Sequence, residues 1–181
     1  EATAKRSGDV QLAKDIHTLR RVTVADNAAN RYFASGVQSI NSGNTSRANQ
    51  LFEKAAKFTV TSRANIANQA MELGRAAYHN ADYLPGTARS GELAKAQAYF
   101  NLVVKINPTA TAYWNLGLAQ AASGAAAKDW QQSFNTASQL ARKSGDMELV
   151  RSISQAYDNL VNHIAQSNAG MAHRFSYGPN G

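Results

Sequence analysis

The side chains that could carry out catalysis or bind a metal are few, because the 181-residue chain has no cysteine and only four histidines. His17, His79, His163 and His173 lie far apart, and no two of them have the short spacing that places two metal ligands on one helix turn. His79 looks most like a site residue, yet we interpret it as a solvated side chain at a helix end. The sequence predicts neither a metal site nor a cofactor.

Other signatures of catalysis are also missing from the sequence. The 12 acidic residues are scattered singly, without the paired carboxylates of a glycosidase. No glycine-rich phosphate loop and no nucleophile elbow occurs. We therefore expect a protein that is not an enzyme.

The net charge of +7, from 19 basic and 12 acidic residues, raises the question of a nucleic-acid partner. Most of this charge lies in residues 27–105, which carry nine basic and four acidic side chains and so a net +5. The longest basic runs are pairs such as Arg20-Arg21, whereas a nucleic-acid tail normally carries a longer block. We do not expect nucleic acid as the partner. An acidic protein and an anionic surface polymer or glycan stay open.

The elements that must position any binding residue are all predicted to be helices. Apolar residues recur three and four apart, and no sustained alternation typical of strands occurs. Helices are expected at about residues 9–24, 26–41, 45–58, 63–80, 91–106, 109–122, 126–143 and 146–166, with a loop over residues 82–90. No apolar run is long enough to span a bilayer, so we expect no membrane span.

Three sets of glycine, alanine and aromatic residues recur along the chain. The sets are Gly36, Gly43, Ala48, Phe52 and Ala55; then Leu73, Gly74, Ala96, Phe100 and Pro108; then Tyr113, Leu116, Gly117, Gly124, Phe134 and Ala137. Glycine at positions 36, 74 and 117 would let antiparallel helices approach closely, and the phenylalanines would fill the space beside them. Phe100 and Phe134 are 34 residues apart, about the period of one helix–turn–helix repeat family.

This pattern resembles the tetratricopeptide repeat (TPR) signature over residues 29–143. The resemblance implies three repeats stacked as a right-handed superhelix, an α-solenoid. Residues 1–28 would form a flanking N-terminal segment and helix, and residues 144–166 a C-terminal capping helix. Two departures stand out. The second repeat carries about ten extra residues around Pro85-Gly86, and Trp130 replaces a small residue, so its ring should push the helix pair apart or face another neighbour.

A TPR stack implies a concave groove lined by the first helix of each repeat, suited to a helix or an apolar peptide. The expected groove residues are Asn30, Phe33, Val37, Ile40, Asn68, Met71, Arg75, Tyr78, Trp114 and Leu118. Phe33 stands where a carboxylate clamp would carry lysine, so a terminal carboxylate is not the expected ligand. A flanking helix that already covers the groove is the alternative reading.

The two ends of the chain give the remaining predictions. Residues 167–181 are rich in Gly, Asn, Ser and Pro and predict a non-regular tail. Met171, Phe175 and Tyr177 could dock this tail on its own body or on a neighbouring subunit. A start without Met, together with the lack of cysteine, suggests an extracellular, cell-surface or periplasmic location. Asn44-Thr45-Ser46 matches an N-glycosylation acceptor on a predicted turn.

Two kinds of protein–protein interaction fit these features. The favoured one is a self-assembling structural subunit, of which a filament is one form, with copies of itself as partners. The other is a monomeric TPR adaptor that binds a segment of a different protein in the concave groove. A nucleic-acid binder, which would lose affinity steeply with salt, and an enzyme are the less favoured readings.

Overall fold

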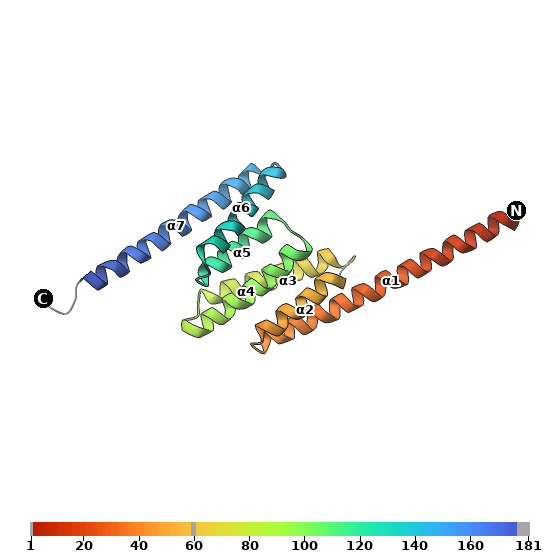
Figure 1. The fold of residues 1–181 in the computed structure, drawn as a ribbon, viewed down its shortest axis with the longest axis horizontal. Coiled ribbons are helices and arrows are strands. Elements are labelled where there is room, and N and C mark those ends of the chain that lie inside the picture. The colour runs from red at the N-terminus through yellow and green to blue at the C-terminus, as the bar shows by residue number, and fades with distance from the viewer. Residues whose placement is uncertain (1, 59–60, 177–181) are drawn as a thin grey trace. The chain divides into compact units, whose positions relative to one another are not determined.

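The computed structural model describes the backbone of residues 2–58 and 61–176, and within them the side chains of residues 11, 12, 14–58 and 61–166. Over these residues the chain forms seven α-helices and no strand (Figure 1). The helices are α1 (Ala2–Asn41), α2 (Thr45–Phe58), α3 (Arg63–Ala81), α4 (Gly86–Ile106), α5 (Ala110–Ala122), α6 (Ala127–Lys143) and α7 (Met147–Ser176). The all-α prediction is confirmed.

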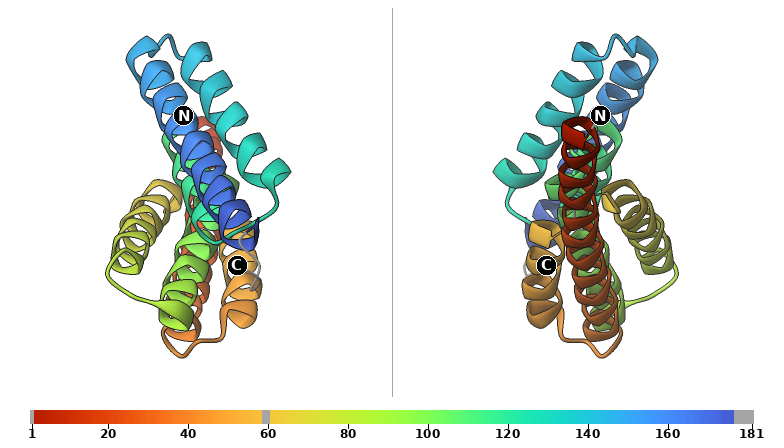
Figure 2. Two further views of the ribbon diagram at one scale, coloured as in Figure 1. Left: turned by 90° about the vertical axis from the view of Figure 1, so that its left-hand side faces the viewer. Right: turned by 90° about the vertical axis from the view of Figure 1, so that its right-hand side faces the viewer.

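The chain divides into two compact units, Glu1–Pro108 and Thr109–Gly181. In the first unit α1 packs on α2, α3 packs on α4, and α2 also contacts α4 (Figures 1 and 2). In the second unit α6 packs against both α5 and α7. Gly43, Gly124 and Gly145 end helices with φ of 79°, 78° and 77°, so the predicted glycine turns use the left-handed conformation that side chains resist.

The same close contact occurs in three helix pairs: α1–α2, α3–α4 and α5–α6. A Cβ atom added to Gly74 would lie 2.6 Å from Cε1 of Phe100, and one added to Gly117 would lie 2.8 Å from Cδ2 of Phe134. A Cβ atom on Gly36 would meet the ring of Phe52 in the same way. All three rings are buried. Glycine is therefore required for these helices to approach, which confirms its predicted packing role.

Trp130 lies on α6, at the position where the TPR resemblance predicts a small residue. Its ring lies 5.7 Å from that of Tyr157 on α7 and 6.4 Å from that of Phe134. Val150 and Ile153 of α7 join the same buried cluster. The large ring thus faces α7, and it ties this last helix to the α5–α6 pair.

Helix α1 continues through the break predicted near residue 25. Asp26 was expected to begin a second helix, but its carboxylate instead accepts hydrogen bonds from the backbone N–H of Thr61 at 3.1 Å and of Ser62 at 3.3 Å. The hydroxyl of Ser62 also donates to it at 3.0 Å. Asp26 therefore binds the start of α3 and leaves α1 uninterrupted, since Val24-Ala25 contains no helix breaker.

Two segments predicted as non-regular are helical. Helix α4 begins at Gly86 rather than at residue 91, because the residues after Pro85 include no further proline and are compatible with a first helical turn. Helix α7 continues to Ser176, although residues 167–181 were predicted as a non-regular tail. Gly170 is the one glycine or proline between Ser167 and Ser176, and the alanines beside it favour helix. The side chains of Met171 and Phe175, and all of Tyr177, lie outside the described residues.

Helix α1 is much longer than its partner. It has 40 residues, about 60 Å, whereas α2 has 14, about 21 Å. The first half of α1 therefore runs beyond α2 (Figure 1). Ala29 is the first buried residue of α1 among those whose side chains are described. The described side chains at the start of α1, those of residues 11, 12 and 14–21, are all exposed.

Candidate functional site

The ten predicted groove residues differ widely in exposure. Phe33 and Ile40 are buried in the α1–α2 pair, where the Phe33 ring lies 5.9 Å from that of Phe52. Three are exposed: Asn30, Asn68 and Arg75. The half-buried ones are Val37, Met71, Tyr78, Trp114 and Leu118. Phe33 and Ile40 are core residues here, and a partner would have to contact the others.

These residues also fall in both units of the chain. Asn30 to Tyr78 belong to the first unit, and Trp114 and Leu118 belong to the second. In the second unit, Trp114 and Leu118 pack against the cluster that contains Trp130. The buried Nε1 of Trp114 has no hydrogen-bond partner among the described residues. Each unit therefore presents its own part of the predicted set.

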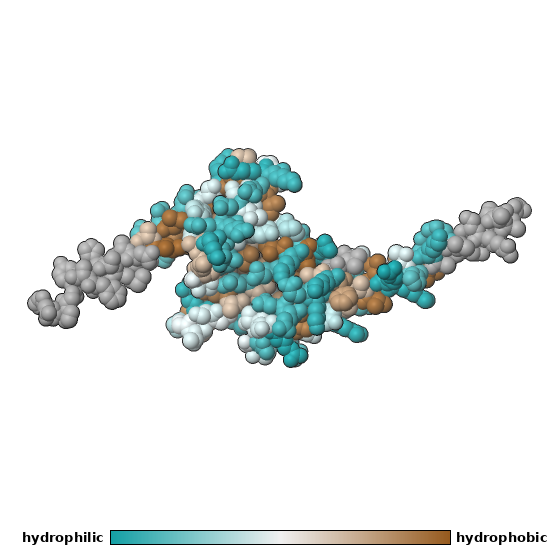
Figure 3. Space-filling model, viewed as in Figure 1, coloured by the Kyte–Doolittle hydropathy of each residue, from teal (hydrophilic) through white to brown (hydrophobic). Residues whose placement is uncertain are grey.

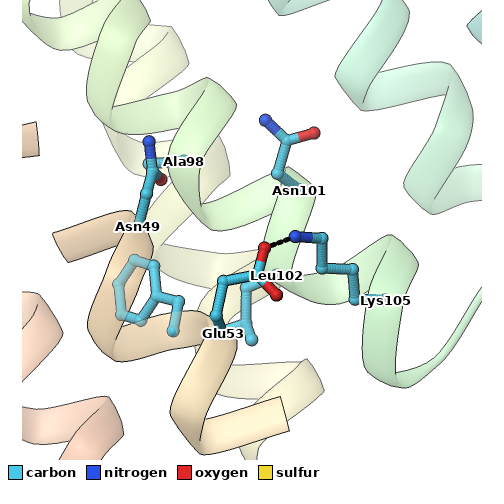
Figure 4. Close-up of a pocket in the computed structure, with 7 residues that line it drawn as sticks. Asn49, Glu53, Ala98, Asn101, Leu102 and Lys105 are labelled. Carbon is cyan, nitrogen blue, oxygen red and sulfur yellow. Dashed lines mark ion pairs between the residues drawn. The ribbon is translucent and has the colours of Figure 1, made fainter. Parts of the chain in front are cut away.

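A polar notch of about 290 Å³ lies between α2 and α4 (Figure 4). Glu53 of α2 and Lys105 of α4 form an ion pair across it, and Asn49 and Asn101 stand at its rim. Both charged side chains are about half exposed, at 48% and 47%. The ion pair links α2 to α4. Because its two charges neutralise each other, the notch offers no net charge to a ligand.

The unpartnered half of α1 carries an apolar stripe formed by Leu12, Ile16 and Leu19. Their exposed fractions are 59%, 44% and 66%. The spacings of four and three residues place them on one face of the helix. Large aliphatic side chains in such a row are normally covered by a partner.

A second exposed surface follows α1 and α2 side by side, and we call it the basic end groove. It consists of two adjoining hollows of about 540 and 510 Å³ that share Val24 and Ala28. The first is lined by His17, Arg20, Arg21, Val24, Ala25, Ala28 and Phe58, and the second by Val24, Asn27, Ala28, Arg31, Tyr32, Ser35, Arg47 and Leu51. Among the described lining residues there are four arginines and no carboxylate.

The floor of the basic end groove is apolar and partly aromatic. Tyr32 and Phe58 stack with ring centroids 5.6 Å apart, and the ammonium group of Lys54 lies 5.6 Å from the Tyr32 ring centre. Val24 is 69% exposed and Phe58 is 43% exposed. In Figure 3 hydrophobic and hydrophilic residues alternate along the exposed part of α1. The groove therefore combines uncovered apolar area with unbalanced positive charge.

Among the described titratable groups, two tyrosines have clearly shifted pKa values. Burial and, to a smaller extent, the Glu92 carboxylate raise the pKa of Tyr99 to about 12. Burial, followed by the charge of Asp82, also raises the pKa of Tyr78, and Arg89 opposes this. Both phenols stay neutral at physiological pH. The His79 ring meets the Tyr83 ring edge-on at 5.1 Å, and the described residues contain no cluster of three metal-binding side chains.

Comparison with known proteins found no matching family model, curated protein or solved structure. Within the described residues, no helix is both long and apolar enough to cross a membrane.

Sequence reasoning missed the basic end groove. A signal for it exists in α2, where Arg47, Leu51, Lys54 and Phe58 follow one another at spacings of four, three and four residues. This spacing puts basic and apolar side chains in alternation on one helix face. The groove could not be identified from α2 alone, because the other wall comes from α1.

Proposed function

We propose that this protein is a non-enzymatic interaction module built of TPR-like helical hairpins. The repeated Gly–Phe contact in three hairpins supports this proposal, because it gives each hairpin the same close approach at corresponding positions. Stacking into a right-handed superhelix is part of the proposal, as is an extracellular, cell-surface or periplasmic location. Hairpin repeats that expose uncovered end faces act by binding other chains.

Self-association is the favoured activity of the module, with copies of the chain as partners. The observation that carries it is the apolar stripe of Leu12, Ile16 and Leu19 on the unpartnered half of α1. Full burial of such a side chain is worth about 1.5–3 kcal/mol, and with roughly half of the area still exposed each can contribute about 1–2 kcal/mol more. The six side chains of two stripes together supply about 6–12 kcal/mol, against an association cost of about 4–15 kcal/mol. We therefore expect weak, concentration-dependent association, which repetition along a filament could strengthen.

Sedimentation velocity and light scattering over a wide range of protein concentration test this proposal. The double variant Leu12→Gln/Leu19→Gln should be monomeric where the wild type associates. Met147→Gln, which removes an apolar side chain that is 55% exposed on α7, is the matched control and should associate like the wild type. Electron microscopy of the wild type distinguishes filaments from closed oligomers. A wild type that stays monomeric at the highest concentration would contradict self-association.

An adaptor for a different protein is the second candidate function. The basic end groove favours it, since none of its described lining residues belongs to the apolar stripe and it carries a charge that self-association through the stripe does not use. The adaptor reading predicts a monomer that captures a partner through α1 and α2.

A further inference from the structure

We propose that the basic end groove binds an acidic amphipathic helix of another protein. This inference rests on the adaptor function proposed above and names its partner by chemistry. It uses a surface different from the concave groove that the TPR resemblance implies.

The charge of the groove requires an acidic occupant. Arg20 and Arg21 stand at one end, Arg31 and Arg47 at the other, and all four are exposed. Glutamates form ion pairs with Arg75, Lys95 and Lys105, whereas no carboxylate stands among the described lining residues of the groove. The groove therefore presents a positive potential that a row of carboxylates would neutralise.

The position of the groove in the fold indicates that a helix is the right shape. One side of α2, with Asn49 and Glu53, faces α4, whereas Arg47, Leu51, Lys54 and Phe58 lie on a different side. That uncovered side is where a further hairpin would pack in a longer stack of repeats. An incoming helix would place apolar side chains on Val24, Leu51 and Phe58.

The spacing of the cations refines the partner. Arg47 and Lys54 are seven residues apart on α2, which is about 10 Å along the helix. Carboxylates separated by two helical turns, with apolar residues three and four positions between them, match this spacing. The partner is thus a helix with an apolar stripe flanked by Glu or Asp.

Other occupants fit the groove less well. Base stacking needs free aromatic faces, but Tyr32 and Phe58 stack on each other and Lys54 lies over Tyr32. A flat bilayer would contact Val24, which is 69% exposed, but little of the half-buried Tyr32 and Leu51 between the two helices. Helix α7 of a second copy is a poor match for the four arginines and Lys54, because its described charged residues are the acidic Glu148 and Asp158 and the basic Arg151.

A synthetic peptide of 18 residues tests the proposal with the full-length protein. The peptide combines Leu at spacings of three and four with flanking Glu in an Ala/Gln background, and its control carries Lys in place of every Glu. Fluorescence anisotropy should show binding of the Glu peptide that weakens with salt, and affinity at least tenfold above that of the Lys peptide.

Charge reversal then locates the site. Arg31→Glu/Arg47→Glu should weaken binding of the Glu peptide at least tenfold. The control Lys128→Glu/Lys143→Glu changes exposed residues of α6 and gives the same net charge, 7 − 4 = +3, and should stay within about threefold of the wild type. Circular dichroism verifies folding, and Arg31→Gln/Arg47→Gln replaces the reversal if that variant does not fold.

Several results would overturn the proposal. These are no binding of the Glu peptide at low salt, equal weakening by both charge-reversed variants, and displacement of the peptide by oligo(dT) or by phosphatidylserine vesicles at lower concentration. A change of oligomeric state in Arg31→Glu/Arg47→Glu would instead assign the groove to a second copy. Leu12→Gln/Leu19→Gln should bind the peptide normally, so failure of self-association and failure of the groove are told apart.

Discussion

Replacing Gly74 by alanine tests the close helix approach on which the hairpin repeat depends. Gly74 lies in α3, and an added Cβ atom would stand 2.6 Å and 2.9 Å from Cε1 and Cδ1 of Phe100 in α4. Carbon atoms pack at about 3.5–4.0 Å. Phe100 is only 1% exposed, so its ring is enclosed by other parts of the protein. Either α3 and α4 must separate or the ring must leave its preferred rotamer.

The expected energy has two parts of opposite sign. Extra volume in a packed core costs about 1–3 kcal/mol. Alanine in place of glycine within a helix gains about 1 kcal/mol. Gly91 provides the matched control, because it lies in α4 with no atom within 4 Å of an added Cβ atom, so Gly91→Ala has the gain alone. The difference in unfolding free energy between the two variants should therefore be about 1–3 kcal/mol.

Urea and thermal unfolding followed by circular dichroism measure this difference. We expect Gly91→Ala to melt above the wild type, and Gly74→Ala to melt about 3–10 °C below Gly91→Ala. In a Phe100→Leu background the clash is relieved, and Gly74→Ala should become neutral or stabilising. If Gly74→Ala stabilises the wild type as much as Gly91→Ala does, the close packing of α3 on α4 is refuted.

Two further predictions concern the first unit. Asp26→Ala removes the acceptor for Thr61 and Ser62 at the start of α3. It should lower the unfolding free energy by about 1–2 kcal/mol in urea melts. The control Asp15→Ala, on the exposed part of α1, should change the unfolding free energy by less than about 0.5 kcal/mol. A Tyr99 pKa of about 12 in the folded protein, above the usual 10.0, means that stability is fully present below pH 10 and is lost as pH rises from about 10 to 12. Melts at alkaline pH should show this loss reduced in Tyr99→Phe, and an equal loss in both proteins would contradict it.

Local sequence signals were sufficient for most helix ends. Gly43, Gly124 and Gly145 mark turns because each needs a positive φ. The sequence signals failed where a side chain contacts a distant segment of the chain. Asp is a residue type that often begins a helix, but the Asp26 carboxylate lies within α1 and binds the start of α3. Propensity alone could not reveal that long-range contact.

The candidate site was harder to predict than the fold. The family resemblance placed Phe33 and Ile40 on the concave groove, whereas both are buried in the α1–α2 pair. Burial depends on which side chains the neighbouring helix supplies, and here the Phe52 ring packs beside Phe33. The basic end groove was missed for the same reason. Arg31 and Arg47 are distant in the sequence and line one hollow only when α2 packs against α1.

Part of the net positive charge is concentrated on one surface of the first unit. Lys95, Lys105 and Arg75 are balanced by glutamates, whereas Arg31, Arg47 and the Arg20-Arg21 pair converge on the basic end groove without a carboxylate among its described lining residues. Positive charge is therefore concentrated on one surface, which the composition could not show. The same net charge of +7 spread evenly over the surface would affect solubility alone.

Helix α1 carries both proposed binding surfaces, and the two adjoin along one edge. At 100° per residue, Leu19 of the apolar stripe and Val24 of the groove floor differ by five residues, or about 140° around the helix. Ile16 and Arg20, however, are four residues apart and so are neighbours on the helix. A partner on the stripe therefore leaves the groove floor uncovered and reaches the groove only at Arg20. Self-association through Leu12, Ile16 and Leu19 and capture of an acidic helix by the arginines can occur on one molecule at once. In that case the peptide should bind the associated and the monomeric protein with equal affinity per chain, and a loss of binding on association would show that the two surfaces overlap.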